Sequence, residues 1–507
     1  MQSKTKAIYF EAIRITTNAM EGPLTSWTAT TLSKAIHTRQ VSCREVMQAY
    51  LKRIDEINPT TNAIVARQPT DKLLQQADEC DTQLARGQSR GPLHGFPMAI
   101  KDLAPTKGIV TTSGCIKFKN FVPTEDALHV AMIREAGAII IGKTNVPELG
   151  LGSHTYNPVY GPTRNAFDHS LSAGGSSGGA AVALALDMVP LADGSDTMGS
   201  LRNPAAWNQV YGFRPSWGLI PRALDTPELF IHQISTHGPM ARNPEDLEML
   251  LNVMARSEPY PFNPFSLGLG VGPLAFDTNP ETALPDPIRV GWLGDLGGYL
   301  ATDPELLAYA RYAVVETMTT KPGERLSAIQ VDENVSVPYT DFASLFWAWC
   351  TLRSWGCVAI ADRITSSDSE RRSVLGPQIN FEYDTGCSLS ARDIHAASVV
   401  GTNWWRALCV LFEKYDFLIL PATQCFPFPV EWRWPEEVAG KRMDTYHRWM
   451  EGMLFASIAG IPVISVPVGF AGGSPSKPVG VQVMAPKGND AKLIAFAKKI
   501  HAVFSGS

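Results

Sequence analysis

The stretch that decides the fold is residues 172–205, SAGGSSGGAAVALALDMVPLADGSDTMGSLRNPA, in which an apolar run separates two glycine-flanked serine loops. Ser176 and Ser177 lie in the first loop, and Ser200 lies in the second. One Gly-Ser-Gly turn usually indicates only a flexible connection, but the apolar run between these two is suited to burial. The pattern therefore predicts that the fold brings the two serine loops together.

The segments around this stretch alternate between strand-like and helix-like patterns. FPMAIK (96–101) and AIIIGKTN (138–145) are strand-like and flank the helical pattern EDALHVAMIREAG (125–137). Within the opening stretch, AAVALALDM predicts a helix and VPLADGSD a strand. This rhythm predicts an α/β fold with a largely parallel sheet, in which catalytic groups lie where strands end and loops begin.

The two ends of the chain add further elements. Residues 27–57 predict two amphipathic helices, the second opened by a Ser42–Glu45 capping box. Near the C-terminus we expect strands and a final helix, and residues 256–288, rich in Pro and Gly, form a long connection. The expected C-terminal elements are strands at 416–423, 461–470 and 479–486 and a helix at 490–504.

Composition indicates a folded protein and argues against several partners. The chain has 507 residues, of which 45% are hydrophobic and 18% charged, and this length alone predicts two or three domains. The net charge is −5 and Lys and Arg form no run, so we expect no nucleic-acid partner. No apolar run reaches the roughly 20 residues of a membrane span, and the N-terminus is a poor signal peptide.

The eight cysteines lack CxxC pairs and close spacing, so we expect free thiols, a reducing compartment and a cytoplasmic location. The chain also lacks an HExxH motif and any Cys/His ligand spacing. We therefore expect no metal and no cofactor.

Three kinds of site could use the serine loops. GSSGG (175–179) matches a nucleophile elbow centred on Ser177, but an elbow needs a strand directly before it and a histidine base, and neither is recognisable. The glycines could instead form an anion-binding nest, although Arg202 is the only basic residue nearby. The third hypothesis takes Lys101 as the base, because a lysine at the end of a buried strand loses solvation and can be a free amine; the alternative is a surface lysine paired with Asp102.

Read together, three motifs resemble the amidase signature family: GFPMAIKD, GGSSGG and GSDTMGSLRNPA. The resemblance extends over about residues 27–500 and is weaker over 256–450. It implies an α/β fold with a central mixed, twisted sheet covered by helices on both faces. Supporting motifs are TTSGC (111–115), IIGKTNVPE (140–148), GPTRNAFD (161–168), GFRPSWGLIP (212–221), DFLILPAT, GIPVISVPVGF and PVGVQVMAP. The implied organisation is an N-terminal extension (1–26) and one amidase-signature domain (27–505), with a catalytic core at about 90–225 and a variable region at about 256–450.

The resemblance also implies a Ser-cisSer-Lys triad. Ser200 would be the nucleophile, Ser176 the bridging serine after a cis peptide from Gly175, and Lys101 the base. A serine hydroxyl is too weak an acid to attack an amide unaided, so Ser176 would accept its proton while passing its own to neutral Lys101.

The loop before Ser200 would form the oxyanion hole, through the main-chain amides of Thr197, Met198, Gly199 and Ser200. Around it, Gly175, Ser177 and a pair between Asp196 and Arg202 would support the loops, and Asn203 and Pro204 would be the N-cap and first residue of the next helix. Family members commonly carry Gly-Gly-Ser at this point, whereas this chain has Met198. We expect Met198 to keep a negative φ and to flank the acyl pocket.

The implied activity is hydrolysis of aryl or alkyl amides through an acyl-enzyme, with carbamates and esters open to the same route. Eight of the twelve tryptophans lie between 340 and 450 and suggest an apolar substrate pocket, with core packing as the alternative. Two other functions stay open, namely that of a non-catalytic binding subunit or that of a glutaminase-type amidotransferase subunit. We expect a small-molecule substrate, no membrane partner, and a monomer or homodimer.

Overall fold

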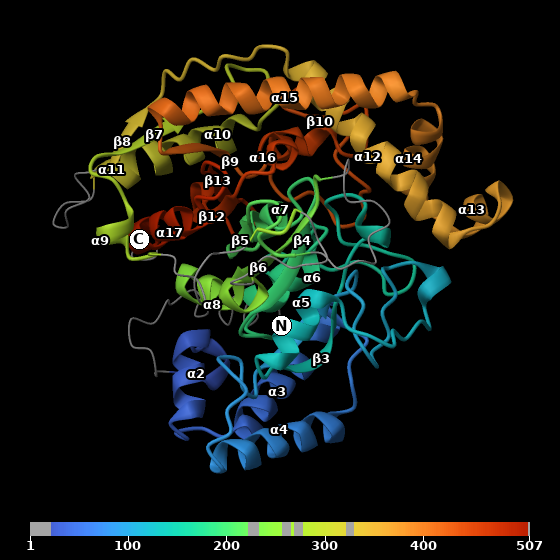
Figure 1. The fold of residues 1–507 in the computed structure, drawn as a ribbon, viewed down its shortest axis with the longest axis vertical. Helices are drawn as coiled ribbons and strands as arrows, with labels where there is room; N and C mark the ends of the chain where they lie inside the picture. The colour runs from blue at the N-terminus through green and yellow to red at the C-terminus, as the bar shows by residue number, and fades with distance from the viewer. Residues whose placement is uncertain (1–21, 222–232, 256–264, 268–276, 321–328, 505–507) are drawn as a thin grey trace.

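The computed structural model (Figure 1) describes most of the chain, and the part of the N-terminal extension before residue 22 lies outside it. Most of the predicted connection at 256–288 also lies outside the described residues. The described ranges are 22–221, 233–255, 265–267, 277–320 and 329–504.

Helices near the N-terminus cover one end of the molecule (Figure 1). The two amphipathic helices predicted at 27–57 are α2 (Ala29–His37) and α3 (Cys43–Thr61), and the Ser42–Glu45 capping box is present. α4 (Thr70–Ala85) packs against α3 and ends just before Gly87, whose φ is +73°. Their apolar faces join the larger of two main hydrophobic clusters.

The strand that carries Lys101 belongs to a three-stranded sheet in the order β1-β3-β2. β2 (Pro97–Lys101) and β3 (Ile139–Thr144) are parallel, joined by the crossover helix α5 (Leu128–Glu135), and β1 (Ile64–Val65) is antiparallel to β3. Every residue of β2 and β3 is buried. Lys101 therefore lies at the carboxyl end of a buried strand, as predicted.

A second sheet has eight strands in the order β4-β6-β5-β12-β13-β9-β7-β8. β4 contacts β2 and so lies beside the three-stranded sheet. The strands span β4 (Ala192–Asp196), β5 (Tyr211–Arg214), β6 (Thr236–Ala241), β7 (Ile288–Trp292), β8 (Ile329–Asp332), β9 (Phe417–Pro421), β12 (Val463–Phe470) and β13 (Pro478–Met484).

The prediction of a largely parallel sheet is wrong, and the mixed sheet implied by the resemblance is confirmed. β7 is parallel to β8 and β9, whereas the pairs from β4 through β13 to β9 are antiparallel. A helical crossover allows parallel pairing, but β12 and β13 are joined by a short turn through residues 471–477, and a short turn can only reverse the chain.

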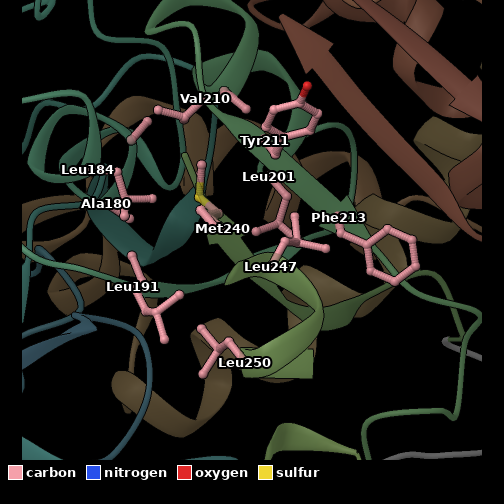
Figure 2. Packing of buried hydrophobic residues seen from close by; sticks show 14 of the residues in the cluster. Ala180, Leu184, Leu191, Leu201, Val210, Tyr211, Phe213, Met240, Leu247 and Leu250 are labelled. Carbon is pink, nitrogen blue, oxygen red and sulfur yellow. The ribbon is translucent and has the colours of Figure 1, made fainter. Parts of the chain in front are cut away.

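Helices flank the sheets and fill the core with small and branched side chains. α6 (Gly178–Ala185), which is the predicted AAVALALDM helix, packs on β4 and β6 beside α8 (Pro244–Met254). Figure 2 shows Ala180 and Leu184 of α6 near Met240 of β6, with Leu247 and Leu250 of α8 below them. The remaining helices of this part are α7 (Arg202–Trp207), α9 (Pro280–Ala283), α10 (Pro304–Arg311) with its π-helical continuation (Tyr312–Thr317) and α11 (Met318–Thr320), α16 (Leu454–Ala459) and α17 (Asp490–Phe504).

The tryptophan-rich region is a helical layer at the opposite end from α2 to α4 (Figure 1). It consists of α12 (Phe342–Ile364), α13 (Asp368–Val374), α14 (Pro377–Cys387) and α15 (Ala391–Lys414), followed by the two-residue strands β10 (Glu437–Val438) and β11 (Lys441–Arg442). Trp349, Trp404 and Trp449 are fully buried and form the second cluster with Trp207. For these tryptophans the structure supports core packing rather than a pocket lining. Within the described residues, no helix has both the length and the apolar character needed to cross a membrane.

Candidate active site

Lys101 is the centre of a buried polar cluster. Its side chain is 1% exposed, and Nζ donates to Ser176 Oγ at 2.9 Å and to Ser177 Oγ at 2.7 Å. Ser195 adds its Oγ at 3.1 Å and its carbonyl oxygen at 3.2 Å. The lysine is therefore not a surface residue, and its Nζ contacts hydroxyl and carbonyl oxygens rather than carboxylates.

Burial sets the protonation of this lysine. The loss of solvation lowers the pKa of Lys101 to about 7, although Asp193 and Asp196 act in the opposite direction. An amine with this pKa is substantially neutral at physiological pH, so it can accept a proton.

The first serine loop packs so closely that glycine is required. The peptide between Gly175 and Ser176 is cis, and α6 begins two residues later at Gly178. A Cβ on Gly179 would lie 2.3 Å from the main-chain nitrogen of Asn145, in the loop after β3. The glycines thus bring the loop against the end of the three-stranded sheet, beside Lys101.

The second serine loop follows β4 directly, since β4 ends at Asp196. Gly199 has φ +82°, and Met453 packs so closely over it that an added Cβ would meet its side chain. Met198 keeps a negative φ, as predicted, and is buried among the second cluster. A glycine at 199 therefore suffices for this turn.

The main chain joins the two loops. The Ser177 amide donates to the Ser200 carbonyl at 3.2 Å, so residues 23 positions apart lie side by side. Ser200 is 8% exposed, and its Oγ bonds to no described residue. This confirms the prediction that the fold brings the serine loops together.

The predicted pair between Asp196 and Arg202 is present and fully buried. Arg202 donates to both carboxylate oxygens at 3.0 Å, and Arg214 lies 3.7 Å from one of them. Burial raises the pKa of Asp196, but the two arginines outweigh it and lower the pKa to about 2. The carboxylate stays ionised and also accepts from the Gly199 and Leu201 amides, which fixes the shape of the loop.

That arrangement changes the expected oxyanion hole. The Gly199 amide, expected to face the oxyanion, donates instead to Asp196 Oδ1 at 2.8 Å. The amides of Thr197, Met198 and Ser200 donate to no acceptor among the described residues. These three amides, without Gly199, are the donors available to a ligand.

The predicted helix start at Asn203 is wrong, because α7 begins at Arg202. The amides of Arg202 and Asn203 both donate to the Gly199 carbonyl, so the first turn starts earlier, in the serine loop itself. Pro204 is tolerated because it still lies in the first turn, where no acceptor awaits its missing N–H. The Asn203 side chain is buried, and neither of its polar atoms bonds to a described residue.

Two neighbours of Lys101 were not predicted from the sequence. Ser195 and Asp193 lie on β4, and Asp193 accepts a hydrogen bond from the Lys101 main-chain amide at 2.9 Å. The signal was the alternation of β4, which places the polar side chains of Asp193 and Ser195 on the same face of the strand. The nucleophile-elbow hypothesis fails, since no strand runs into Ser177 and its hydroxyl contacts Lys101 rather than a histidine.

A cleft of about 540 Å³ lies outside this cluster, and none of Lys101, Ser176 and Ser200 lines it. Its walls come from the loop after β3 and from α13, α14 and the turn between them, and they include Leu151, Tyr156 and Leu375. Gly150, the chain neighbour of the lining residue Leu151, lies near the cluster, because a Cβ on it would be 3.7 Å from Ser176 Oγ. No tryptophan lines this cleft. Among the described residues, no group of three or more His, Cys, Asp or Glu side chains could hold a metal ion.

The fold and this cluster define an α/β protein built around a buried lysine and two serine loops. Comparison with known proteins agrees, since residues 45–494 match the amidase family model. The chain is 33% identical to a subunit of the glutamyl-tRNA(Gln) amidotransferase of Thermus thermophilus, over 90% of this chain and 93% of that protein. It is 30% identical to the acylamidase of Rhodococcus erythropolis, over 94% of this chain and 95% of that protein.

Comparison with solved structures also indicates the amidase signature family. The crystal structure of a bacterial aryl acylamidase of the amidase signature family superposes with a TM-score of 0.83 at 25% identity, covering 94% of this chain and 96% of that one. The chain belongs to the amidase signature family and is an amide-hydrolysing enzyme.

Proposed function

We propose that this enzyme hydrolyses aryl or alkyl amides through Ser200 as nucleophile, Ser176 as bridging serine and Lys101 as base. The observation that carries the proposal is the contact of 2.9 Å between Lys101 Nζ and Ser176 Oγ, in a buried site where the pKa of the lysine falls to about 7. A neutral amine in this position can take the Ser176 proton, which the ammonium form cannot.

In the acylation step, Ser200 Oγ attacks the amide carbonyl carbon and forms a C–O bond. The Ser200 proton passes to Ser176, whose own proton passes to the Lys101 lone pair. The carbonyl oxygen becomes an oxyanion, to which the amides of Thr197, Met198 and Ser200 can donate.

Collapse of the tetrahedral intermediate breaks the C–N bond. The proton held by Lys101 returns through Ser176 to the leaving nitrogen, so an amine departs and Ser200 holds an acyl ester. Water then attacks the acyl carbon, and its proton passes through Ser176 to Lys101. The C–O bond to Ser200 breaks, the proton returns through Ser176 to Ser200 Oγ, and the acid is released. An ester or a carbamate would acylate Ser200 in the same way, and we include both in the proposed range.

Two observations support an apolar substrate. The cleft between the loop after β3 and the α13–α14 turn has apolar side chains at Leu151, Val374 and Leu375, and Met198 and Met453 pack at the second serine loop. The Rhodococcus erythropolis relative is named an acylamidase, and the similar solved structure is that of an aryl acylamidase, so both names point to acyl amides as substrates. We propose that the cleft holds the part of the substrate remote from the scissile bond.

The proposal is tested by nitroaniline release from an acyl nitroanilide and nitrophenol release from a matched nitrophenyl carbamate. Ser200→Ala serves as the blank, since it removes one oxygen that bonds to no described residue. Release from the anilide by the wild type alone supports the proposal, and the carbamate rate measures its extension to urethanes. Equal rates for wild type and Ser200→Ala would refute the assignment of the nucleophile.

A second candidate is a glutaminase-type activity, favoured by the 33% identity to an amidotransferase component. It requires a small polar amide rather than an apolar one. Ammonia release from glutamine, measured beside nitroaniline release, separates the two. Glutamine cleavage without anilide cleavage would favour the second candidate, and binding of an amide without turnover would favour a non-catalytic role.

We further propose a cytoplasmic location and a monomeric or homodimeric state. The location is supported by the eight cysteines, all of which are free thiols. Cell fractionation tests the location, and light scattering on the purified protein tests the oligomeric state.

A further inference from the structure

A buried carboxylate lies between Lys101 and a pair of stacked histidines, and the proposed reaction gives it no step. Asp193 is 1% exposed, and its Oδ1 accepts from the Lys101 main-chain amide at 2.9 Å. Its Oδ2 lies 3.4 Å from Nε2 of His129, which is equally buried. The His129 ring stacks on His237 with centroids 4.0 Å apart.

The position of Asp193 ties two sheets together at the proposed base. β2 ends at Lys101, and the amide of this last residue is bonded by a side chain of β4 rather than by a main-chain carbonyl. His129 reaches the same carboxylate from α5, and His237 lies on β6. Four elements therefore converge on Asp193, and the point they fix is the end of the strand that carries the lysine.

The charge of Asp193 is also less compensated than that of its neighbour. Asp196 is committed to Arg202 and Arg214, so its negative charge is largely cancelled. Asp193 has no arginine partner among the described residues. The charged or titratable side chains around Asp193 and Lys101 are Lys143 on β3, His129 on α5, Asp196 on β4 and His237 on β6, with Asp102 and Asp126 acting on Lys143.

We propose that Asp193 is a positioning residue for Lys101. Its carboxylate anchors the end of β2 through the Lys101 main-chain amide and acts on the Lys101 amine through its charge, while His129 holds the carboxylate from its other side. This inference rests on the proposed role of Lys101 as base. Its chemical consequence is a stronger base, because a buried amine without the Asp193 charge would bind protons more weakly.

The direction of the pKa of Lys101 agrees with this role. Burial lowers it, and Asp193 is the larger of the two carboxylate influences that raise it again, which leaves it at about 7. Removing the Asp193 carboxylate therefore lowers the affinity of Lys101 for a proton, and Lys101 of an Asp193 variant should titrate at lower pH.

The experiment is Asp193→Asn, which keeps an oxygen for the Lys101 amide and removes only the charge. Two readouts follow the lysine: the acid limb of kcat/KM for a nitroanilide, and the titration of Lys101 in [ε-13C]lysine-labelled protein, its resonance identified by its loss in Lys101→Met. We expect both midpoints to move down by about 1 pH unit. The plateau rate at high pH falls a few-fold as well, because the weaker base is less effective.

The two readouts separate the inference from the proposed function. A titration of Lys101 that does not move in Asp193→Asn overturns the inference, and so does a loss of thermal stability with both midpoints unchanged, which is the outcome of a purely structural role. A shifted titration with an unshifted rate profile keeps the inference and refutes Lys101 as the base. The NMR readout remains decisive even if the wild type cleaves no anilide.

Two further proteins serve as a control and as a substitute. Asp71→Asn removes the same charge from an exposed site and should move neither midpoint. If Asp193→Asn does not fold, the double variant His129→Leu with Asp193→Leu replaces both members of the buried pair by apolar side chains and leaves neither unpaired. It should show the same downward shift in the Lys101 titration, and an unchanged midpoint would again overturn the inference.

Discussion

Two buried cations in this protein, Lys101 and Arg353, have opposite surroundings. Within the described part of the chain, Nζ of Lys101 donates only to oxygens of Ser176, Ser177 and Ser195, and no carboxylate is hydrogen-bonded to it. Arg353, on α12, donates to the Glu382 carboxylate of α14 at 2.6 Å. One cation is surrounded by neutral oxygens, and the other is paired directly with a negative charge.

The side chains around Arg353 hydrogen-bond to one another. Ser354 donates to the second Glu382 oxygen at 2.6 Å, and the Tyr446 hydroxyl bonds to both Arg353 and Glu382. Burial lowers the pKa of Arg353, but its partners outweigh this effect and raise the pKa. Burial raises the pKa of Glu382, but Arg353 outweighs it and lowers the pKa. Both groups therefore stay charged at neutral pH.

The comparison shows what burial does to a cation. Desolvation always favours the neutral form, and a bonded carboxylate can reverse that effect. Lys101 has only partial compensation, so its proton can leave, which a base requires. Arg353 has full compensation, so its network can hold α12 against α14 but cannot exchange protons.

The largest effect is expected from Ser200→Ala, which tests the proposed reactive site around Lys101. We expect the rate of anilide hydrolysis to fall by about a thousandfold or more, because no other hydroxyl can form the acyl-enzyme. The thermal unfolding midpoint should stay near that of the wild type, since Oγ bonds to no described residue. Initial rates and differential scanning calorimetry measure the two outcomes, and a near-normal rate would contradict the triad.

The pH dependence of the wild type tests the charge state of Lys101. Because its pKa is about 7 and the neutral form is the base, kcat/KM should fall about tenfold for each pH unit below that value and level off above it. Lys101→Met should lose most of the activity at every pH. Lys72→Met, at an exposed site, is the control and should keep the wild-type profile. A flat profile from neutral to acid pH would exclude a neutral lysine as base.

Glu382→Gln tests the structural role of the buried network around Arg353. It leaves the Arg353 charge buried without its partner, which should lower the free energy of unfolding by about 3 kcal/mol or more, measured by urea denaturation. Glu333→Gln removes the carboxylate of an exposed pair with Arg311 and should change stability far less. Equal losses in the two variants would show that the buried network is no more important than a surface pair.

The same variant has a predicted pH dependence. The folded-state pKa of Glu382 is lowered, so its contribution to stability is present above the ordinary carboxyl range and is lost as the pH falls through the lowered pKa. Glu382→Gln has no such contribution to lose. The difference in unfolding free energy between wild type and variant should therefore narrow in acid.

Asp490 provides the smallest expected effect. It is a buried carboxyl group whose hydrogen-bond partners among the described residues are a hydroxyl and an amide. It accepts from the Ser216 amide at 2.8 Å and from its Oγ at 2.6 Å, and burial raises its pKa to about 6. The folded state thus holds this proton more tightly than the unfolded chain, whose carboxyl has a pKa of 3.8. Its contribution is complete below the unfolded value and is lost as the pH rises through about 6.

We therefore expect Asp490→Asn to remove one part of the pH dependence of stability. Between pH 8 and pH 5 the melting temperature of the wild type should rise, relative to that of the variant, by a few degrees at most. Differential scanning fluorimetry of both proteins across this range measures the difference. A constant difference would show that Asp490 does not titrate there.

Much of this fold could be predicted from local patterns. The helices at 29–37, 43–61 and 178–185 and the strand that ends at Lys101 follow from apolar periodicity and from caps that act over three or four residues. The sheet topology could not be predicted in this way, because the pairing of β4 with β6 or of β5 with β12 joins segments that share no local signal. The start of α7 was misplaced for a related reason, since the Gly199 carbonyl caps it from within the serine loop.

By itself, the sequence determined which residues we propose as reactive: a lysine at the end of an apolar strand and serines in two glycine-rich loops. Only the tertiary structure decided their chemical state. The pKa of Lys101 depends on the solvent excluded by β2, β3 and α6 and on the charge of Asp193, which lies 92 positions further along the chain. Asp196, paired with Arg202, likewise accepts the Gly199 amide, which removes that donor from the proposed oxyanion hole. Solvation and charge act through space, and folding determines which side chains share that space.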